Sequence, residues 1–220
     1  MRIGTWNLDN RRLNKQHFDL IHKQQCDVWL LTELNPRSSL DSQGKLDGFY
    51  CHMSSGVMAR GQHWAAVCSV EPLTAYPDPH PASASAMVRG IMFCSTILPW
   101  RGAPSETPWS GHNHAAKTAT ALNMLLTLLP KSNLVWGGDW NHAFGGTEFA
   151  GSKLGREHLR KAIKTLELTV ATEQLGHRIP GCFTIDHIAL PAAWRFTNER
   201  QITANGLSDH DAYVVDAILP

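Results

Sequence analysis

The sequence predicts a mixed α/β or α+β fold in which packed β-sheets carry helices on their outer faces. Short apolar segments recur along all 220 residues, and two or three segments between them have helical spacing. Hydrophobic residues make up 43% of the chain and charged residues 18%, which excludes a disordered or fibrous protein. This length suits one domain, so we expect residues 1–220 to fold as a single unit.

In the N-terminal half, the pattern predicts strands around a single helix. Residues 2–8 alternate as a strand, and residues 13–25 carry apolar side chains at helical spacing. Residues 27–34 are apolar almost throughout, as in a strand covered on both faces, and Glu33 lies at the strand exit. Further strands are expected within residues 49–53, 63–70 and 86–98.

Three stretches predict loops. Residues 38–48 are polar, and residues 77–85 contain three prolines, which cannot donate hydrogen bonds to a sheet. Residues 99–114 are rich in Pro, Gly and Ser and show no regular period. We expect these stretches to connect elements at the surface.

The C-terminal half predicts two helices and four strands. Residues 115–129 are rich in Ala, Leu and Met and end at Pro130, and residues 155–166 are amphipathic. Residues 134–138 form a buried apolar strand. The last three strands are expected around residues 183–190, 194–202 and 212–219. The whole chain therefore contains about nine to ten predicted strands.

Charge and cysteine content limit the function classes. The net charge of +1 is too small to hold nucleic acid by charge alone, so any contact with a polyanion must be local. The odd number of cysteines and the lack of a CxxC pair indicate buried free thiols in a reducing compartment. The cysteines are Cys26, Cys51, Cys68, Cys94 and Cys182. No apolar run reaches the ~18–20 residues of a membrane span, so we expect a soluble, cytoplasmic protein with no membrane partner. We also expect a monomer.

Polar side chains recur at the ends of the apolar strands. The segments TWN, LLTE, GGDWN, TIDH and LSDH each place a carboxylate or an amide there. These residues are Asn7, Glu33, Asp139, Asn141, Asp186 with His187, and Asp209 with His210. Because side chains of an extended chain alternate between faces, Asp139 and Asn141 are expected on one side and Trp140 in the packing. By the same alternation, His187 faces away from Asp186 as a hydrogen-bonded core or surface histidine.

A hard cation explains this pattern. Carboxylates that converge repel one another unless they are paired, hydrogen-bonded or bound to a cation. The oxygen-only set is Asn7, Glu33, Asp139, Asn141 and Asp209. That donor set favours Mg²⁺ or Mn²⁺ over zinc. Each residue alone is equally well explained by a turn or a cap, and only the whole set argues for a site.

The motifs TWN, LTE, GGDWNH, IDHI and SDHD, in this order across residues 6–211, resemble those of a known family. It is the endonuclease/exonuclease/phosphatase family, the metal-dependent phosphoesterases related to DNase I. The resemblance implies a four-layer α/β sandwich, two packed mixed sheets flanked by helices, with the site at one end of the sheets. It also implies that Glu33 is the main metal ligand, assisted by Asn7 and Asp209.

The same resemblance implies catalytic roles. Asp139 and Asn141 would position or deprotonate the attacking water and hold the scissile phosphate. His210 would be the acid/base or a phosphate contact, oriented by a hydrogen bond to Asp186. Imidazole suits proton transfer near neutral pH, but the sequence leaves open whether His210 or Asp139 takes the proton of the water.

One position departs from the family pattern. Family members usually carry a histidine at the end of a central strand, where it contacts the phosphate, and Ile97 stands there instead. Candidates for a substitute donor, in or just after the following loop, are Arg101, His112, His114 and Lys117. Trp100 is a candidate for base stacking, with packing of its loop onto the body as the alternative. His142 is close enough to GGDWN to contact substrate, or it only begins a turn.

The sequence therefore predicts a Mg²⁺- or Mn²⁺-dependent phosphodiesterase, a nuclease that acts on DNA or RNA. Two alternatives remain at this level. One is a small-molecule or lipid phosphoesterase of the same fold, because the fold does not select the substrate. The other is a non-catalytic relative that binds nucleic acid, which the isoleucine at position 97 favours and the full set of metal ligands opposes.

Overall fold

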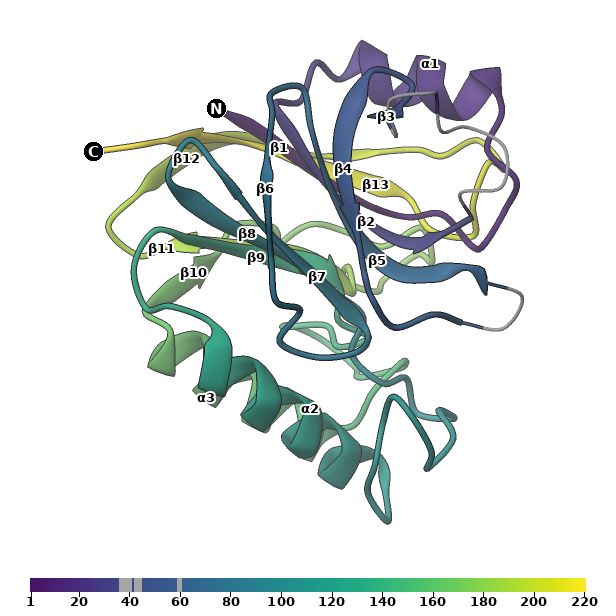
Figure 1. The fold of residues 1–220 in the computed structure, drawn as a ribbon. Helices are drawn as coiled ribbons and strands as arrows, with labels where there is room; N and C mark the ends of the chain where they lie inside the picture. Colours follow the sequence, from purple (N-terminus) through teal and green to yellow (C-terminus); the bar gives the residue numbers. More distant parts are fainter. Residues whose placement is uncertain (36–40, 42–44, 59–60) are drawn as a thin grey trace.

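The structure is a computed structural model that describes residues 1–35, 41, 45–58 and 61–220. Within these residues, two β-sheets pack face to face, and helices cover the outer face of each sheet (Figure 1). One helix lies on the first sheet and two lie side by side on the second, which gives four layers. The predicted four-layer α/β sandwich is therefore confirmed.

The described part of the chain forms a seven-stranded sheet and a six-stranded sheet. The first sheet is, in spatial order, β12 (Arg195–Ile202), β13 (Ala212–Ile218), β1 (Arg2–Asn7), β2 (Val28–Leu34), β5 (His63–Ser69), β4 (Phe49–Met53) and β3 (Lys45–Leu46). The second is β10 (Leu168–Val170), β11 (Asp186–Pro191), β9 (Leu134–Asp139), β8 (Ile91–Thr96), β7 (Ser83–Val88) and β6 (Thr74–Tyr76). The helices are α1 (Lys15–Lys23), α2 (His114–Leu128) and α3 (Lys153–Thr165).

Each helix begins at a polar residue that caps its free backbone N–H groups. Asn14 caps α1, and its side chain accepts hydrogen bonds from two N–H groups of the first turn. The side chains of Asn113 and Ser152 each accept one such hydrogen bond at the start of α2 and α3. Such caps are typically worth about 1 kcal/mol each, because they satisfy donors that have no partner within the helix.

Three apolar cores hold the layers together. Between the sheets, the buried side chains include Ile3, Leu30, Phe93, Val135 and Ile188. Ile21 of α1 packs on the outer face of the first sheet, and Leu125 of α2 and Leu159 of α3 pack on that of the second. Burial of one such side chain contributes roughly 1.5–3 kcal/mol, so the packing of the sheets fixes their mutual position.

The two parallel strand pairs position the functional residues. β1 pairs in parallel with β2, and β8 pairs in parallel with β9. Parallel strands end at the same edge of a sheet, so Asn7 and Glu33 come to one edge of the first sheet. Asp139 ends β9 at the facing edge of the second sheet.

The paired glycines before Asp139 allow this close packing. A Cβ atom on Gly137 would lie 2.5 Å from the carbonyl oxygen of His187 on β11 and 2.7 Å from Leu30 of the other sheet. A Cβ atom on Gly138 would lie 2.3 Å from the carbonyl oxygen of Thr96, and its φ of +119° is unfavourable for other residues. Because Gly137 and Gly138 have no side chains, β9 can lie this close to its neighbours β8 and β11.

Several predicted boundaries need correction. The predicted loop 77–85 is wrong at its end, because β7 begins at Ser83, after the last proline, and its small side chains fit between the sheets. Three short strands, β3, β6 and β10, were not predicted, because they have too few residues to show a period in the sequence. Most of the predicted loop 38–48 lies outside the described residues. None of the helices in the described part is long and apolar enough to span a membrane.

The expectation of free thiols is wrong for one pair. Cys51 and Cys68 are directly opposite each other in the antiparallel pairing of β4 with β5, and they form a disulfide. Their spacing along the chain carries no sign of this, because the sheet register brings them together. Cys26 and Cys94 are free and buried as expected, and Cys182 is free and partly exposed.

Candidate active site

Asn7 lies at the centre of a polar cluster because it ends β1, between the other strands of the first sheet. Its Nδ2 donates hydrogen bonds to Glu33 Oε1 at 3.1 Å and to Asp139 Oδ2 at 3.0 Å. Its Oδ1 accepts the backbone N–H of Asp9 at 2.9 Å. One buried amide therefore joins carboxylates from both sheets.

Glu33 enters the cluster where its backbone leaves the regular strand geometry. Its φ of +52° is a left-handed conformation, which costs a non-glycine residue roughly 1–2 kcal/mol. Its Oε2 accepts a hydrogen bond of 2.5 Å from Nδ2 of Asn10. Its neighbours Thr32 and Leu34 are fully buried, whereas Glu33 is partly exposed. The backbone of Glu33 is thus locally strained, and a hydrogen bond holds its carboxylate in a fixed position.

Asp139 and Asp186 are register partners in the pairing of β9 with β11. Nδ1 of His210 donates a hydrogen bond of 2.7 Å to Oδ2 of Asp186, so the predicted carboxylate–imidazole hydrogen bond is confirmed. One potential ligand atom from each of these three residues lies within 4.8 Å of the others. Asp139 and Asp186 thus add carboxylate oxygens to the side-chain oxygens of Asn7 and Glu33.

The turn before β13 is tied to the end of β1. Oγ of Ser208 donates a hydrogen bond of 2.6 Å to the carbonyl oxygen of Asn7 and accepts the backbone N–H of His210 at 3.0 Å. The Asp209 side chain is 62% exposed, and its Oδ1 lies 4.0 Å from Nε2 of His210. The charge of Asp209 also raises the pKa of Glu33, as expected for carboxylates on one side of the molecule.

Burial and mutual repulsion shift the pKa values of the cluster. Burial raises the pKa of Asp139 to about 7, and the charges of Asp186 and Glu33 add to this effect while His210 opposes it. Burial likewise raises the pKa of Glu33, against the hydrogen bond from Asn7. Burial lowers the pKa of His210, but the charges of Asp186 and Asp139 outweigh this effect and raise the pKa to about 10. At neutral pH, His210 therefore carries a proton and Asp139 is close to its own titration.

The cluster has chemical features that suit a hard cation. Three carboxylates, Glu33, Asp139 and Asp186, interact with the imidazolium of His210. Oδ1 of Asp186 is buried and has no hydrogen-bond partner among the residues that the structure describes. A buried acceptor without a partner costs roughly 1–3 kcal/mol, and coordination of a divalent cation by oxygen removes such a cost. The residues present therefore fit Mg²⁺ or a similar cation.

Asn141 reaches the cluster by a different route from the expected one. β9 ends at Asp139, and Asn141 has a φ of +52°, so a left-handed turn places its side chain instead of strand alternation. Its backbone N–H donates to Oδ1 of Asp139 at 3.0 Å, and its Nδ2 donates to the carbonyl oxygen of Leu98 at 3.0 Å. Trp140 is fully buried, as expected.

Two histidines predicted to contact substrate are buried in the body of the protein instead. His142 is 0% exposed, and its Nδ1 lies 2.7 Å from the carbonyl oxygen of Trp140. His114 is 9% exposed, and its two ring nitrogens bond to Ser152 and to the carbonyl oxygen of Pro99. Close packing of the segment after β9 against the start of α2 encloses both rings, so neither is accessible to a substrate.

The proposed substitutes for the missing histidine also lie elsewhere. Ile97 is 1% exposed and packs in the core below the second sheet. Lys117 is buried, and its ammonium donates to the carbonyl oxygen of Ala103, so it holds the loop before α2. His112 is exposed at the end of that loop. Neither Lys117 nor His114 therefore replaces the missing histidine as a hydrogen-bond donor to the phosphate.

Arg101 and Trp100 stay accessible. The Arg101 guanidinium donates to the carbonyl oxygens of Gly151 at 2.9 Å and Glu148 at 3.0 Å. Trp100 is 37% exposed and packs edge-on against Trp109, whose ring is buried. The loop is thus packed onto the body through Trp109, and the contact of Trp100 with a base stays a prediction.

Three residues of the site escaped the sequence analysis. Asn10 holds Glu33, Ser208 holds the turn that carries His210, and the ring of His177 lies edge-on to that of His210 with centroids 6.2 Å apart. A cavity of about 520 Å³ is lined by His177 and Ser208 among others. Ser208 belongs to the motif LSDH, so the sequence could have identified it. Asn10 and His177 are in loops outside every motif.

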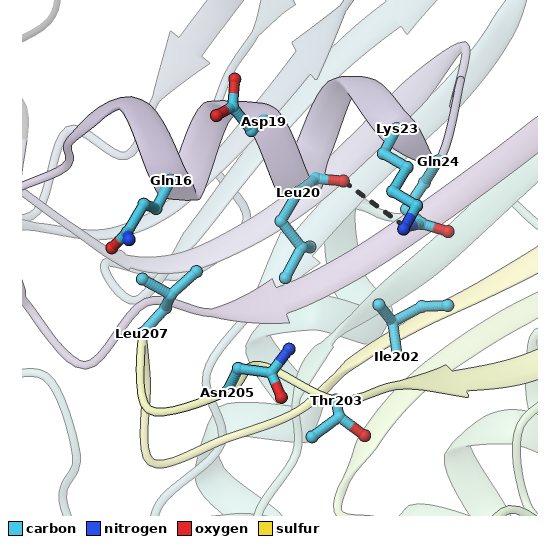
Figure 2. Close-up of a pocket in the computed structure, with 9 residues that line it drawn as sticks. All are labelled: Gln16, Asp19, Leu20, Lys23, Gln24, Ile202, Thr203, Asn205 and Leu207. Atoms are coloured by element: carbon cyan, nitrogen blue, oxygen red, sulfur yellow. Dashed lines mark hydrogen bonds between the residues drawn. The ribbon is translucent and has the colours of Figure 1, made fainter.

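A separate groove of about 350 Å³ runs between α1 and the segment after β12 (Figure 2). Its lining residues are Gln16, Asp19, Leu20, Lys23, Gln24, Ile202, Thr203, Asn205 and Leu207. The groove contains none of the clustered carboxylates and imidazoles. It is therefore distinct from the candidate active site.

Comparisons with known proteins agree with this geometry. The family model described as the endonuclease/exonuclease/phosphatase family matches residues 4–210. The structure is similar to the endonuclease domain of TRAS1, a telomere-specific non-LTR retrotransposon, with a TM-score of 0.70, 16% identity and coverage of 99% of this chain and 98% of that one. No curated protein matches the sequence.

Two further solved structures show the range of the fold. An AP endonuclease from Leishmania major has a TM-score of 0.70, 17% identity and coverage of 100% of this chain and 88% of that one. A mannosyl-6-phosphatase from Bacteroides thetaiotaomicron VPI-5482 has a TM-score of 0.61, 12% identity and coverage of 100% of both chains. At these identities, the similarity establishes the fold alone.

The four-layer fold with carboxylates and an imidazole at one end of its sheets defines the class of DNase I-like proteins. Because the family model spans most of the chain, the protein belongs to the endonuclease/exonuclease/phosphatase family. Members of this family are hydrolytic phosphoesterases.

Proposed function

We propose that the protein is a divalent-cation-dependent phosphodiesterase that cleaves DNA or RNA. The observation that carries the proposal is the meeting of five side chains from both sheets at one end of the molecule. They are Asn7, Glu33, Asp139, Asp186 and His210. Glu33 would hold Mg²⁺ or Mn²⁺, with assistance from Asn7 and Asp209. When bound, the cation would supply neutralisation of phosphate charge and activation of water.

Two residues of the chain suit the proton transfers. Asp139, with a pKa raised to about 7 by burial, is a suitable base for the attacking water near neutral pH. His210, protonated at neutral pH, is a suitable hydrogen-bond donor to a phosphate oxygen or to the leaving oxygen. Asp186 orients that imidazole, and Asn141 would help to hold the phosphate. General acid–base groups of this kind typically contribute about 10²–10⁴-fold each.

The names of two similar structures support nucleic acid as the proposed substrate class. The similar structures named above include an endonuclease domain and an AP endonuclease. The exposed indole of Trp100 near the site offers a surface for base stacking, worth roughly 1–3 kcal/mol per base.

The test is incubation of the purified protein with plasmid, single-stranded DNA and RNA, each with Mg²⁺, with Mn²⁺ or with chelator. We expect cleavage that requires the cation, and a loss of about 10²-fold or more in Glu33→Gln and in Asp139→Asn. A phosphomonoester and a phospholipid serve as alternative substrates. Turnover of one of these with nucleic acid left intact would refute the nuclease proposal.

Asp19→Asn is a matched control, because Asp19 is an exposed carboxylate on α1 that pairs only with Lys15 among the described residues. It removes the same charge at a position of α1 outside the cluster and should leave cleavage unchanged. Equal activity in Glu33→Gln, Asp139→Asn and this control would show that the cluster performs no catalysis.

A further inference from the structure

A surface cavity of about 360 Å³ lies between the segment after β8 and the start of α3. Its lining residues are Arg101, Gly146, Thr147, Glu148, Lys153 and Arg156. None of them belongs to the cluster of carboxylates and imidazole described above. The cavity therefore needs its own chemical explanation.

Both guanidinium groups of the cavity are fixed by the surrounding backbone. Arg101 donates to the carbonyl oxygens of Gly151 and Glu148. Arg156 donates through Nη1 to the carbonyl oxygen of Gly146 at 3.1 Å and through Nε to Oε2 of Glu148 at 2.9 Å. Groups that are already ordered lose little conformational entropy when they bind a ligand.

The cavity carries an excess of positive charge. Glu148 is the single carboxylate among its lining residues, all of which are described, and its side chain is only 2% exposed. Its two oxygens are already engaged, Oε1 by the N–H of Gly151 at 3.1 Å and Oε2 by Arg156. Three cations thus face one occupied carboxylate. In the described part of the chain, Lys153 has no ion-pair partner.

The position of Lys153 strengthens this charge. It is the first residue of α3, after the cap Ser152, and the first turn of this helix contains no acidic residue. The N-terminal end of a helix has a partial positive charge, so a lysine there is unfavourable for the helix unless an anion lies nearby.

The cavity lies close to the candidate active site. The N–H of Leu98 bonds to the carbonyl oxygen of Asp139 at 3.0 Å, and Arg101 is only three residues further along the chain. Three residues span at most about 10 Å. The N–H of Arg101 bonds to Ala150, which places the two segments that form the cavity against each other.

We propose that this cavity binds a backbone phosphate of the nucleic acid other than the phosphate that is cleaved. This inference rests on the proposed nuclease function. Arg101, Lys153 and Arg156 surround the phosphate, and the backbone between the two phosphates passes the loop that follows β9. The cavity thereby selects a substrate with more than one phosphate and sets its position relative to Asp139.

The test measures binding of a fluorescent single-stranded DNA of twelve nucleotides in chelator, where no turnover is needed. Lys153→Gln and Arg101→Gln should each weaken binding, by roughly 3- to 10-fold, and should lower the dependence of log affinity on log salt by about 0.7–1. Lys161→Gln is the control, because it removes the same charge from an exposed position of α3 outside the cavity. It should change affinity less than twofold.

Lys153 is exposed, so its replacement tests the cavity even if Arg101→Gln disturbs the loop that the arginine holds. Equal affinity and equal salt dependence in Lys153→Gln and Lys161→Gln would overturn the inference. A selective loss in Lys153→Gln, in a protein that cleaves no nucleic acid with Mg²⁺ or Mn²⁺, would support the phosphate site and refute the proposed nuclease. The two failures are therefore distinguishable.

Discussion

His210 donates a hydrogen bond of 2.7 Å to Asp186, a residue 24 positions earlier in the chain. Asp186 is the register partner of Asp139, and Asp139 accepts a hydrogen bond from Asn7. Two hydrogen bonds and one strand register pair thus link side chains of both sheets.

Replacement of Asp186 by Asn should lower the pKa of His210. The charge of Asp186 is the largest of the effects that raise this pKa to about 10, and the amide keeps the shape of the side chain without the charge. The measurement is a titration of the imidazole resonances by NMR in chelator. Asp209→Asn should cause a smaller decrease, because the charge of Asp209 raises this pKa less than the charges of Asp186 and Asp139 do. An unchanged pKa in Asp186→Asn would contradict the assigned contact.

Addition of Mg²⁺ or Mn²⁺ should raise the Tm of the protein. A ligand that binds only the folded state stabilises it, by about 2.7 kcal/mol at a concentration of one hundred times Kd. Glu33→Gln and Asp139→Asn should reduce this increase, since each removes a negative charge from the cluster. The assay is thermal unfolding over a range of cation concentrations. An increase of equal size in both variants would place the cation elsewhere.

Replacement of Gly138 by Ala should destabilise the fold by about 2–4 kcal/mol, from overpacking and from backbone strain together. Its Cβ atom would lie 2.3 Å from the carbonyl oxygen of Thr96 at a φ of +119°. Gly90→Ala is a control for strain alone, because Gly90 has a φ of +77° and open space around it. Urea unfolding measures both changes. Equal losses of stability would show that the contact with Thr96 has no effect.

Replacement of both Cys51 and Cys68 by Ser should lower the free energy of unfolding by about 3 kcal/mol. The disulfide closes a loop with a sequence separation of 17, and its loss increases the entropy of the unfolded chain. Mass spectrometry with and without reductant establishes the bond, and urea unfolding measures its effect. Cys94→Ser, at a buried free thiol, distinguishes loss of the disulfide from loss of a sulfur atom in the core.

Stability should fall as the pH drops from about 6.5 to about 4. Burial lowers the pKa values of His80, His142 and His187 from the ordinary 6.5 to about 4. Each is neutral in the folded protein but takes up a proton on unfolding within this range. Stability from these histidines is therefore complete above pH 6.5 and lost progressively below it, by up to about 1.4 kcal/mol per pH unit for each histidine.

His80→Asn isolates one of the three contributions. Nδ1 of His80 accepts the N–H of Ala82 at 3.0 Å, and the asparagine oxygen can take the same hydrogen bond. The free energy of unfolding is measured in urea at several pH values. In the variant, the dependence of unfolding free energy on pH should be smaller by the contribution of one proton. An unchanged dependence would mean that His80 takes up its proton in the folded protein at the same pH as in the unfolded chain.

Much of the candidate site follows from sequence pattern. Strands were recognisable in the sequence either by alternation of apolar and polar residues or by a short continuous apolar run. The polar residues at the ends of these strands marked Asn7, Glu33 and Asp139. The order of the motifs then predicted the four layers and the hydrogen bond between Asp186 and His210, both of which the structure confirms. The roles of these residues in catalysis stay predictions.

Other features have no local pattern. His142 follows GGDWN directly but is enclosed, whereas His177 lies in an unmarked loop and faces His210. Cys51 and Cys68 pair only because the register of two strands places them opposite each other. A single sequence records neighbours along the chain, and such contacts depend on which surfaces pack together.

The sequence by itself determined the order of the longer strands and the helices, the polar residues at the strand ends and the oxygen donors that suit a hard cation. Only the tertiary structure decided that Asn7 lies between Glu33 and Asp139, and that Arg101, Lys153 and Arg156 enclose one cavity. The physical reason is that hydrophobic burial drives the two sheets together without regard to separation along the chain. Contacts between side chains that are distant in the sequence therefore result from the packing of the sheets.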